Sequence, residues 1–288
     1  GTETQLSQRN WRTNVTTLSG DIGISGNNSD NSYSVIVNEG INSAIFDGFT
    51  VTQANATPPT GNLNGGGIYN AGSSPTIRNC IFSNNTGSYG NAGIFNFNDG
   101  TPTIINCLFI NNVGTVYSSG VFNFGGSANI INCTFYGNHT AIINQAGNLV
   151  SVSNCILWGN NNSFNIIVPP TTAFTVANSI VQGGWSGTGN LNADPLFVNA
   201  AGGDFRLQAC SPAIDAGNDS ANNTSTDLGG SPRKTDIYPG GSQIDMGAYE
   251  ALAGDNTPPT ITCPATQTLT LGANCSASLP NYTNLATT

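Results

Sequence analysis

Apolar and polar positions repeat in one phrase that is written four times between residues 65 and 160. Each copy runs aliphatic-x-Asn-Cys-x-(Phe or Leu) and ends at an Asn three residues later. The Asn-Cys pairs begin at positions 79, 106, 132 and 154, so the period is 27, 26 and then 22 residues. A degenerate fifth copy follows with Val176, Asn178, Ser179 and Val181. A period of roughly 20 to 50 residues is typical of solenoids, propellers and arrays.

The repeated phrase predicts short strands. Each copy is a run of β-branched and aromatic residues, and Gly, Asn, Ser and Pro bound it as turn residues. One such unit cannot bury its own apolar side chains, whereas stacking it on the next unit, about 4.8 Å away, pairs the backbone groups of both. We therefore expect an all-β protein built as a right-handed parallel β-helix, which is a solenoid.

Comparison of the copies predicts which side chains face the interior. The slot of Ile77 is aliphatic in every copy, the slot of Phe82 is large and apolar, and the slot of Cys80 is Cys four times and then Ser. Strict alternation along a strand cannot place all three on one face, so the phase slips by one residue at the Asn. We expect a bend there, with the Asn in the left-handed or bridge conformation.

Side chains in matching slots are expected to stack as ladders along the axis of the solenoid. An interior column holds Cys80, Cys107, Cys133 and Cys155. An amide column at the bend holds Asn79, Asn106, Asn132 and Asn154, and a second one holds Asn85, Asn112, Asn138 and Asn160. Four stacked thiols with no His nearby make a row and not a tetrahedron, so we interpret the cysteines as small buried side chains.

Composition narrows the possible partners. The 288 residues carry a formal charge of −9 with six basic residues, so we expect no nucleic-acid partner and no anionic membrane surface. No stretch approaches the ~20 apolar residues of a membrane span, and no signal segment opens the chain. Because the sequence starts at Gly1 without Met, we expect a mature or truncated piece.

The chain is expected to have four parts. Residues 1–193 form the coils of the β-helix, and residues 194–253, where the period disappears and acidic residues concentrate, form its closing coils and cap. Residues 254–259 read as a linker. Residues 260–288 read as two strands of a partial Ig-like β-sandwich module that stops before a sandwich can close.

The first and last parts each carry one further expectation. Residues 45–51 match the repeat if Asp47 takes the Asn slot and Gly48 is an inserted residue. In the last part, Cys263 and Cys275 are disulfide candidates whose partners stay open, and a disulfide there would imply an oxidising compartment.

Several stretches resemble bacterial extracellular proteins. The phrases at 65–68 and 82–85 resemble the repeats of polymorphic outer-membrane and related right-handed β-helix surface proteins. Residues 194–250 resemble the end of choice-of-anchor β-helix proteins, and residues 255–283 resemble the opening of a hyalin-repeat (HYR) module, an extracellular Ig-like adhesion unit. Asp219-Ser220-Ala221 resembles the acceptor of bacterial O-glycosylation systems, which makes Ser220 a candidate glycosylation site. The resemblance indicates the architecture of the chain. It does not indicate an activity, because a fold does not fix an activity.

An enzyme that cleaves polysaccharides on a β-helix needs clustered carboxylates and a cation. Between residues 40 and 193 the only charged residues are Asp47, Arg78 and Asp99. Because no neighbouring copies present a carboxylate pair, we expect a protein that is not an enzyme. Tyr136 and Trp158 occupy matching positions in successive copies and would suit stacking on a sugar ring, although outward packing under a loop explains them equally well.

The acidic part contains one candidate metal site. Oxygen ligands suited to calcium come from Asp215, Asn218, Asp219 and Asp227, although self-capped turns explain the same residues equally well. Arg233 is expected to pair with Asp245 or Glu250 rather than with a ligand. Calcium is thus the one cofactor that the sequence suggests.

These features predict a non-enzymatic, extracellular structural or adhesive segment of a large bacterial surface protein, at the cell surface or secreted. The solenoid would be a rigid spacer, and the incomplete module would be completed by downstream Ig-like modules or by another copy of the chain. Strand donation by a neighbour is β-augmentation, and a head-to-tail contact of this kind extends into a filament. The alternative is a polysaccharide-binding or polysaccharide-degrading β-helix, whose partner would be extracellular polysaccharide.

Overall fold

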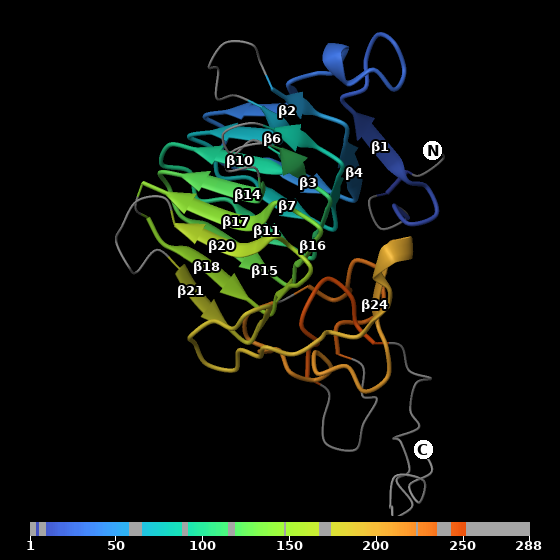
Figure 1. The fold of residues 1–288 in the computed structure, drawn as a ribbon, viewed down its shortest axis with the longest axis vertical. Coiled ribbons are helices and arrows are strands. Elements are labelled where there is room, and N and C mark those ends of the chain that lie inside the picture. The colour runs from blue at the N-terminus through green and yellow to red at the C-terminus, as the bar shows by residue number, and fades with distance from the viewer. Residues whose placement is uncertain are drawn as a thin grey trace, which may run out of the picture.

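The computed structural model describes residues 4–5, 10–57, 65–87, 92–114, 119–146, 148–166, 174–222, 224–234 and 243–251. Within these residues the chain winds through three parallel sheets, coil after coil, and forms the parallel β-helix that the repeat predicts (Figure 1). Apart from two 3-10 turns, η2 (Asn28–Asp30) and η3 (Ala200–Gly202), the regular structure of the described residues is all β.

Strands stack in chain order within each of the three large sheets. Sheet A consists of β1 (Thr16–Ser19), β4 (Phe49–Thr52), β8 (Ile81–Ser83), β12 (Leu108–Ile110), β16 (Thr134–Tyr136), β19 (Ile156–Leu157) and β22 (Ile180–Val181). Sheet B consists of β2 (Ser34–Glu39), β6 (Gly66–Ala71), β10 (Ile94–Phe97), β14 (Ser119–Phe124), β17 (Thr140–Gln145) and β20 (Asn162–Ile166). Sheet C consists of β3 (Ile45–Asp47), β7 (Thr76–Arg78), β11 (Thr103–Ile105), β15 (Ala128–Ile131), β18 (Val150–Ser153) and β21 (Phe174–Ala177).

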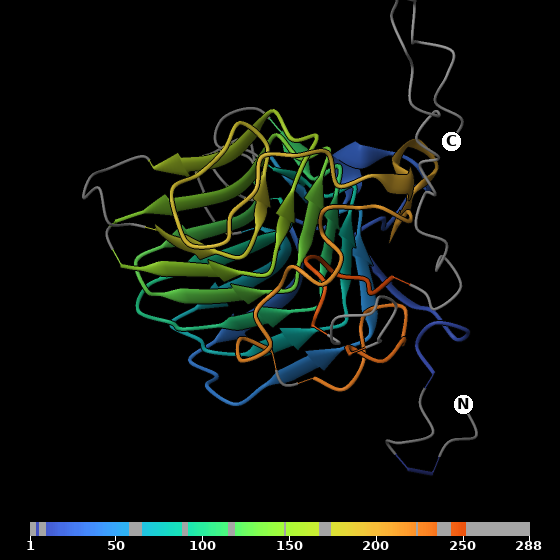
Figure 2. The ribbon, with the colours of Figure 1, turned by 90° about the horizontal axis from the view of Figure 1, so that it is seen from below.

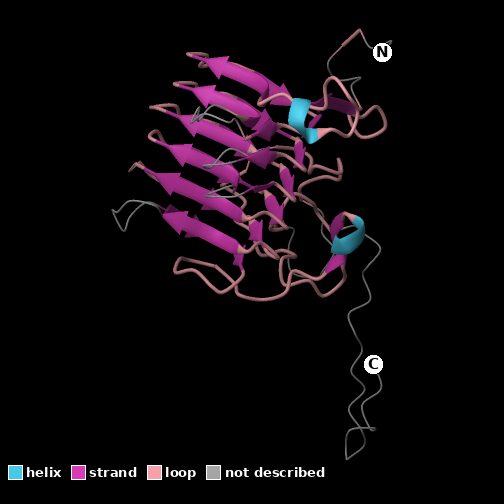
Figure 3. Cartoon of the chain, turned by 45° about the horizontal axis from the view of Figure 1, so that its top comes forward, coloured by secondary structure: helices cyan, strands magenta, loops and turns pink. Residues whose placement is uncertain are grey.

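Two smaller sheets complete the strand inventory of the described residues. Sheet D is parallel and holds β5 (Asn55–Ala56), β9 (Thr86–Gly87) and β13 (Val113–Gly114). The other is an antiparallel pair, β23 (Phe197–Asn199) and β24 (Asp204–Leu207), which lies beyond the coils in sequence. Figure 3 shows the arrows of the largest visible sheet pointing in one direction, as a parallel solenoid requires.

The interior is filled by columns of identical or similar side chains. Pairing aligns Phe82 with Phe109 and Phe109 with Phe135, and the three rings stack with centroids 5.0 and 4.5 Å apart. All three phenylalanines are fully buried, and burying a side chain of this kind contributes roughly 1.5–3 kcal/mol. A repeat that keeps its large apolar slot therefore builds a continuous core by stacking like on like.

The predicted bend at the conserved Asn is present in every copy. Asn79, Asn106, Asn132, Asn154 and Asn178 all have φ between 47° and 54°. This left-handed conformation costs most residues about 1–2 kcal/mol. Asn tolerates it because its short side chain can hydrogen-bond locally. The bend joins sheet C to sheet A and shifts the alternation of inward side chains by one residue.

An amide ladder runs along the second bend. Asn85 Nδ2 donates to Asn112 Oδ1 at 2.9 Å, Asn112 to Asn138 at 3.0 Å, and Asn138 to Asn160 at 2.9 Å. Each rung also donates to a backbone carbonyl of the preceding coil, as Asn112 does to Phe82 O at 3.0 Å. Every buried amide in this column is thus satisfied, and the column ties each coil to the next.

A third ladder, along sheet B, falls outside the sequence prediction. Asn38 donates to Asn70 at 2.7 Å and Asn70 to Asn96 at 2.9 Å, while Asn123 donates to Asn144 at 3.0 Å. Between the two halves, the Asn96 Nδ2 and Asn123 Oδ1 atoms are buried without a partner. The ladder is therefore interrupted once, in the middle of the sheet.

The end of the solenoid that follows β22 is covered by residues 182–193. Leu191 forms a parallel bridge with Ile180, and the ring of Trp185 lies 4.6 Å from that of Phe164 and 6.0 Å from that of Phe174. Residues 194–251, called the flank segment below, add no strand to sheets A to C in their described part. The flank segment lies along one side of the coils, where Figures 1 and 2 show it in yellow to orange-red. The sequence predicts closing coils and a cap in this segment, whereas the structure shows a lateral cover.

Candidate functional site

The flank segment packs on the outer face of sheet A through a second apolar cluster. Residues of the flank in this cluster include Phe205, Leu228 and Met246, and residues of sheet A include Leu108, Ile156 and Ile180. The outward slots of the repeat that vary between copies are apolar here because another layer covers them. The sequence prediction missed this face, since these slots carry no fixed residue type.

Tyr136 and Trp158, the predicted sugar platform, lie beneath this cover. The Tyr136 ring is 5.1 Å from the ring of Phe205 and 6.2 Å from that of Phe197, and Trp158 packs against the same cluster. Outward packing under a loop describes these contacts of both residues. Stacking of a sugar on this pair stays a prediction.

The amide column at the first bend serves as a docking strip for the flank segment. Asn222 Nδ2 donates to Asn106 Oδ1 at 3.1 Å and to Asn132 Oδ1 at 2.9 Å, and so bridges two rungs that have no direct bond in the structure. Arg233 Nη2 donates to Asn106 Oδ1 at 2.7 Å, and Asn154 Oδ1 accepts the Asn218 N–H at 2.7 Å. The rungs Asn79 to Asn106 and Asn132 to Asn154 stack directly, at 3.3 and 3.2 Å.

Buried carboxylates organise the flank segment from within. Arg233 pairs with Glu250 at 2.7 Å, and both side chains are only 2% exposed, which confirms one of the two pairings expected for Arg233. Glu250 also accepts the Asp245 N–H at 3.2 Å, and Asp245 accepts the Ala251 N–H at 2.6 Å. Burial raises the pKa of Glu250 to about 8 and that of Asp245 to about 6. These groups hold the loops of the flank segment together.

The four residues predicted to bind calcium do not converge. Each is engaged elsewhere: Asp215 with Gln243 N, Asn218 with Ser220 N, Asp219 with Lys234 Nζ and Ile244 N, and Asp227 with Ser231 N and Glu250 N. Among the described residues, no group of three or more His, Cys, Asp or Glu side chains could hold a metal ion. The calcium interpretation is therefore corrected, and turn capping explains these oxygens.

Ser220 lies on the surface of the flank segment. Its side chain is exposed, and its hydroxyl donates to Asn218 Oδ1 at 2.8 Å. A polar hollow beside it is lined by Asn222, Thr224 and Lys234 among others. The position is open to a modifying enzyme, and glycosylation of Ser220 stays a prediction.

The cysteine column lies in the interior core. Cys80, Cys107, Cys133 and Cys155 are all free thiols and at most 1% exposed. The backbone N–H of Cys107 points to Cys133 Sγ at 3.4 Å, and the N–H of Cys133 points to Cys155 Sγ at 3.4 Å. Burial raises the pKa of Cys107 and Cys155 well above the ordinary value, so these groups remain neutral thiols.

Two predictions lie outside the described residues. They are the disulfide candidates Cys263 and Cys275 and the Ig-like module at 260–288, together with its linker at 254–259. Within the part of the chain that is described, no helix is long and apolar enough to cross a membrane.

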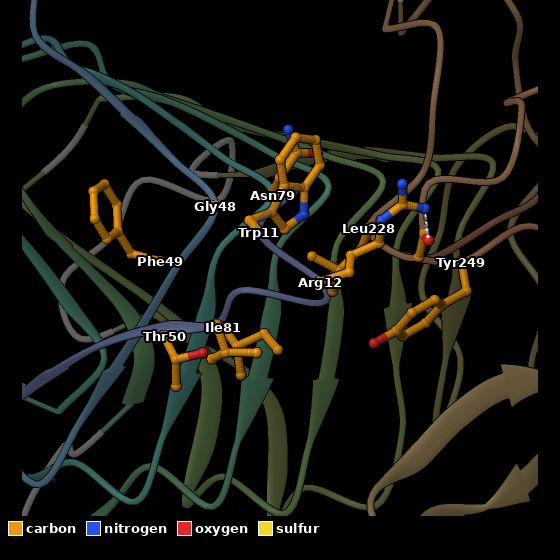
Figure 4. Close-up of a pocket in the computed structure, with 11 residues that line it drawn as sticks. Trp11, Arg12, Gly48, Phe49, Thr50, Asn79, Ile81, Leu228 and Tyr249 are labelled. Atoms are coloured by element: carbon orange, nitrogen blue, oxygen red, sulfur yellow. Dashed lines mark hydrogen bonds between the residues drawn. The ribbon is translucent and has the colours of Figure 1, made fainter. Parts of the chain in front are cut away.

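A cavity of about 320 Å³ opens where the flank segment ends over the early coils. Figure 4 shows Trp11 above it, Thr50 and Ile81 of sheet A below, and Tyr249 of the flank segment to the right with its hydroxyl pointing inward. Leu228 and Arg12 also line it. Burial raises the pKa of Tyr249 to about 12, so its hydroxyl stays protonated. The Trp11 Nε1 atom is buried and has no hydrogen-bond partner.

Among the described residues, the coil at the opposite end from Trp185, called the open coil below, presents strand edges and exposed apolar side chains. Strands β1, β2 and β3 are the edge strands of sheets A, B and C. The described residues include ten exposed large apolar side chains, and seven of them lie in this coil: Val15, Ile22, Ile24, Tyr33, Val37, Ile41 and Ile45. Unpaired strand edges beside exposed apolar side chains form a surface on which another strand can be added.

The fold and these surfaces define the protein as a parallel β-solenoid with asparagine ladders and a lateral cover. A scan of protein-family models finds no match to this chain, and a search of curated proteins finds none either.

Proposed function

We propose that the chain is a structural or adhesive segment of an extracellular protein, and that it assembles with another copy of itself through the open coil that carries β1 to β3. The observation that carries this proposal is the coincidence of three unpaired sheet edges with seven exposed apolar side chains at one end. At the other end, by contrast, Trp185 and Leu191 cover the coil.

The interior supports a rigid spacer. Continuous columns of Phe, Cys and Asn lock each coil to its neighbours, and solenoids of this kind gain stability from every added interface. Another coil placed on the open end would continue the interior columns, because Ile36 of β2 and Phe46 of β3 stand in inward slots, aligned with Ile68 and Ile77. Docking of this coil on an unlike surface of the next copy would be head-to-tail and would extend into a filament, whereas docking of two open coils on each other would close as a dimer.

A structural role also agrees with the state of the charged residues in the coils. Arg78 pairs with Asp47 at 2.9 Å, and Asp47 Oδ1 accepts the Asn79 amide at 2.8 Å. The register pairs Asp47 with Arg78, so Gly48, with φ of 78°, takes the slot of Asn79 and no residue is inserted. The expectation that Asp47 takes the Asn slot is therefore wrong, although its carboxylate bonds to the Asn79 amide and helps to hold the coil.

The test is self-association of the purified chain of residues 1–288. We expect wild-type protein to form assemblies that grow with concentration, measured by light scattering after size exclusion and by negative-stain microscopy. The double variant Val37→Lys, Ile45→Lys should be monomeric, because two charges at the edge would oppose strand addition. Both side chains are more than half exposed, at 55% and 62%, so the change should leave the melting temperature almost unaltered.

The matched control is Leu149→Lys, which adds a charge at an exposed apolar side chain outside the first coil. It should assemble like the wild type. A wild-type chain that stays monomeric at all concentrations, or a double variant that assembles normally, would refute the proposal.

A further inference from the structure

We propose that the cavity between Trp11 and Tyr249 binds one ring of a neutral saccharide. This inference does not rest on self-assembly: apart from Val15, which also belongs to the open coil, the cavity is lined by Trp11, Arg12, sheet A with its adjoining bend, and the flank segment. Its volume of about 320 Å³ is at the small end of the roughly 300–1,000 Å³ that ligand pockets occupy.

The first step is the unpaired indole. Trp11 Nε1 is buried, and no acceptor among the described residues contacts it. A buried donor without a partner costs about 1–3 kcal/mol, so a ligand that supplies an oxygen there recovers this energy on binding. A purely aliphatic ligand would fill the space and leave the donor unpaired.

The second step is the distribution of polar and apolar groups. The rings of Trp11 and Tyr249 border the hollow, and Ile81 and Leu228 provide further apolar wall (Figure 4). Aromatic faces suit the flat C–H face of a pyranose ring. The hydroxyls of Thr50 and Tyr249 are able both to donate and to accept, which matches the hydroxyl groups around such a ring.

The third step concerns charge. Arg12 is the one charged residue in the described lining, and its Nη1 already donates to Gly229 O, while its Cζ lies 5.9 Å from the centroid of the Trp11 ring. The chain as a whole carries a formal charge of −9. A polyanionic ligand would be repelled by that field, so the cavity favours a neutral sugar.

The experiment is a ligand-observed NMR titration of the chain of residues 1–288 with methyl glycosides of glucose, galactose and mannose, and with glucuronate. We expect saturable binding of at least one neutral glycoside. Trp11→Ala should abolish it, and Trp11→Phe, which keeps a ring and loses the N–H, should weaken it about tenfold. Tyr33→Ala removes an exposed aromatic side chain outside the cavity and should bind like the wild type.

Three outcomes would overturn the proposal. Absence of saturable binding by any neutral glycoside excludes a saccharide site, and unchanged binding by Trp11→Ala excludes this cavity. Binding of glucuronate alone would refute the neutral ligand. Thermal unfolding of Trp11→Ala close to that of the wild type shows that a loss of binding is not a loss of fold. None of these results depends on whether the chain self-associates.

Discussion

Asparagine performs two tasks in this solenoid, and they require different properties of the same residue. At the first bend the backbone needs positive φ, and five copies meet this need with Asn. At the second bend the left-handed residue is the one before the ladder, Asn84 or Asn111 in two copies and Gly137 or Gly159 in the next two. There the ladder Asn itself contributes its amide, so its replacement removes hydrogen bonds without relieving a strained backbone.

The rung Asn112 tests this distinction. Its amide group bonds to Asn85, Asn138 and Phe82 O, and it is fully buried. Asn112→Ala should lower the free energy of unfolding by about 2–4 kcal/mol, because several buried partners lose their bonds. Urea unfolding measures the change.

The control for this rung is Asn129→Ala, at an exposed position of β15. Its effect should stay within about 0.5 kcal/mol. Equal losses for the two variants would show that the ladder contributes nothing specific.

The positions of residues that recur in every copy of the repeat were predictable from the sequence. The contacts of residues that occur outside the repeat were not. The columns of Phe82, Cys80 and Asn79 follow from comparing copies, because a shared environment selects the same side chain each time. Asn222 and Trp11 occur outside the repeat, and their partners lie far away in sequence. Only the folded path of the chain brings them together. The one local signal for the cavity in the sequence was that Trp11 is directly followed by Arg12, one of only six basic residues.

At the scale of elements, the flank segment depends on its protonation state. The pKa of Glu250 rises to about 8 and that of Asp245 to about 6, in both cases chiefly by burial, whereas their ordinary values are 4.5 and 3.8. The folded segment therefore holds protons that the unfolded chain releases. Its stabilisation is complete below about pH 4 and is lost as the pH rises through 6 and then 8.

We therefore expect the flank segment to unfold more readily at pH 8 than at pH 5, by about 3–5 kcal/mol, since one unit of pKa shift corresponds to about 1.4 kcal/mol. Denaturant unfolding followed by the fluorescence of Trp158, which this segment covers, measures the difference. The lowered pKa values of Asp204 and Asp219 act in the acid range and do not offset it.

Glu250→Gln is the matched variant for this pH dependence. It keeps the size of the side chain and removes its titration, so the slope of stability against pH between 5 and 8 should become smaller. A slope identical to that of the wild type would assign the effect to another group.

At the scale of the whole molecule, the order of coils was predictable and the lateral cover was not. A fixed period with invariant inward slots specifies stacking, and the three parallel sheets follow. Residues 194–251 carry no period, and their acidic loops pair with the coils through Asn106, Asn132 and Asn154. Such contacts between a repeating and a non-repeating segment leave no pattern in the sequence.

The cysteines report on the integrity of the entire solenoid. Cys210 is exposed and should react at once with a thiol reagent, whereas Cys80, Cys107, Cys133 and Cys155 should stay unmodified until the coils open. Peptide mapping after timed alkylation gives the measurement, and fully denatured protein gives the reference in which all four react. Rapid modification of the column in native protein would contradict the closed core.

The flank segment also changes how the coils come apart. In an ordinary solenoid each unit contacts only its neighbours, so unfolding can spread from an end one unit at a time. Here one apolar cluster reaches from Ile81 to Ile180, and it binds the coils between them into a single cooperative block. The first coil lies outside that cluster, so fraying is confined to the end where we propose that another copy docks. The least stable part of the solenoid is then the part that assembly would stabilise.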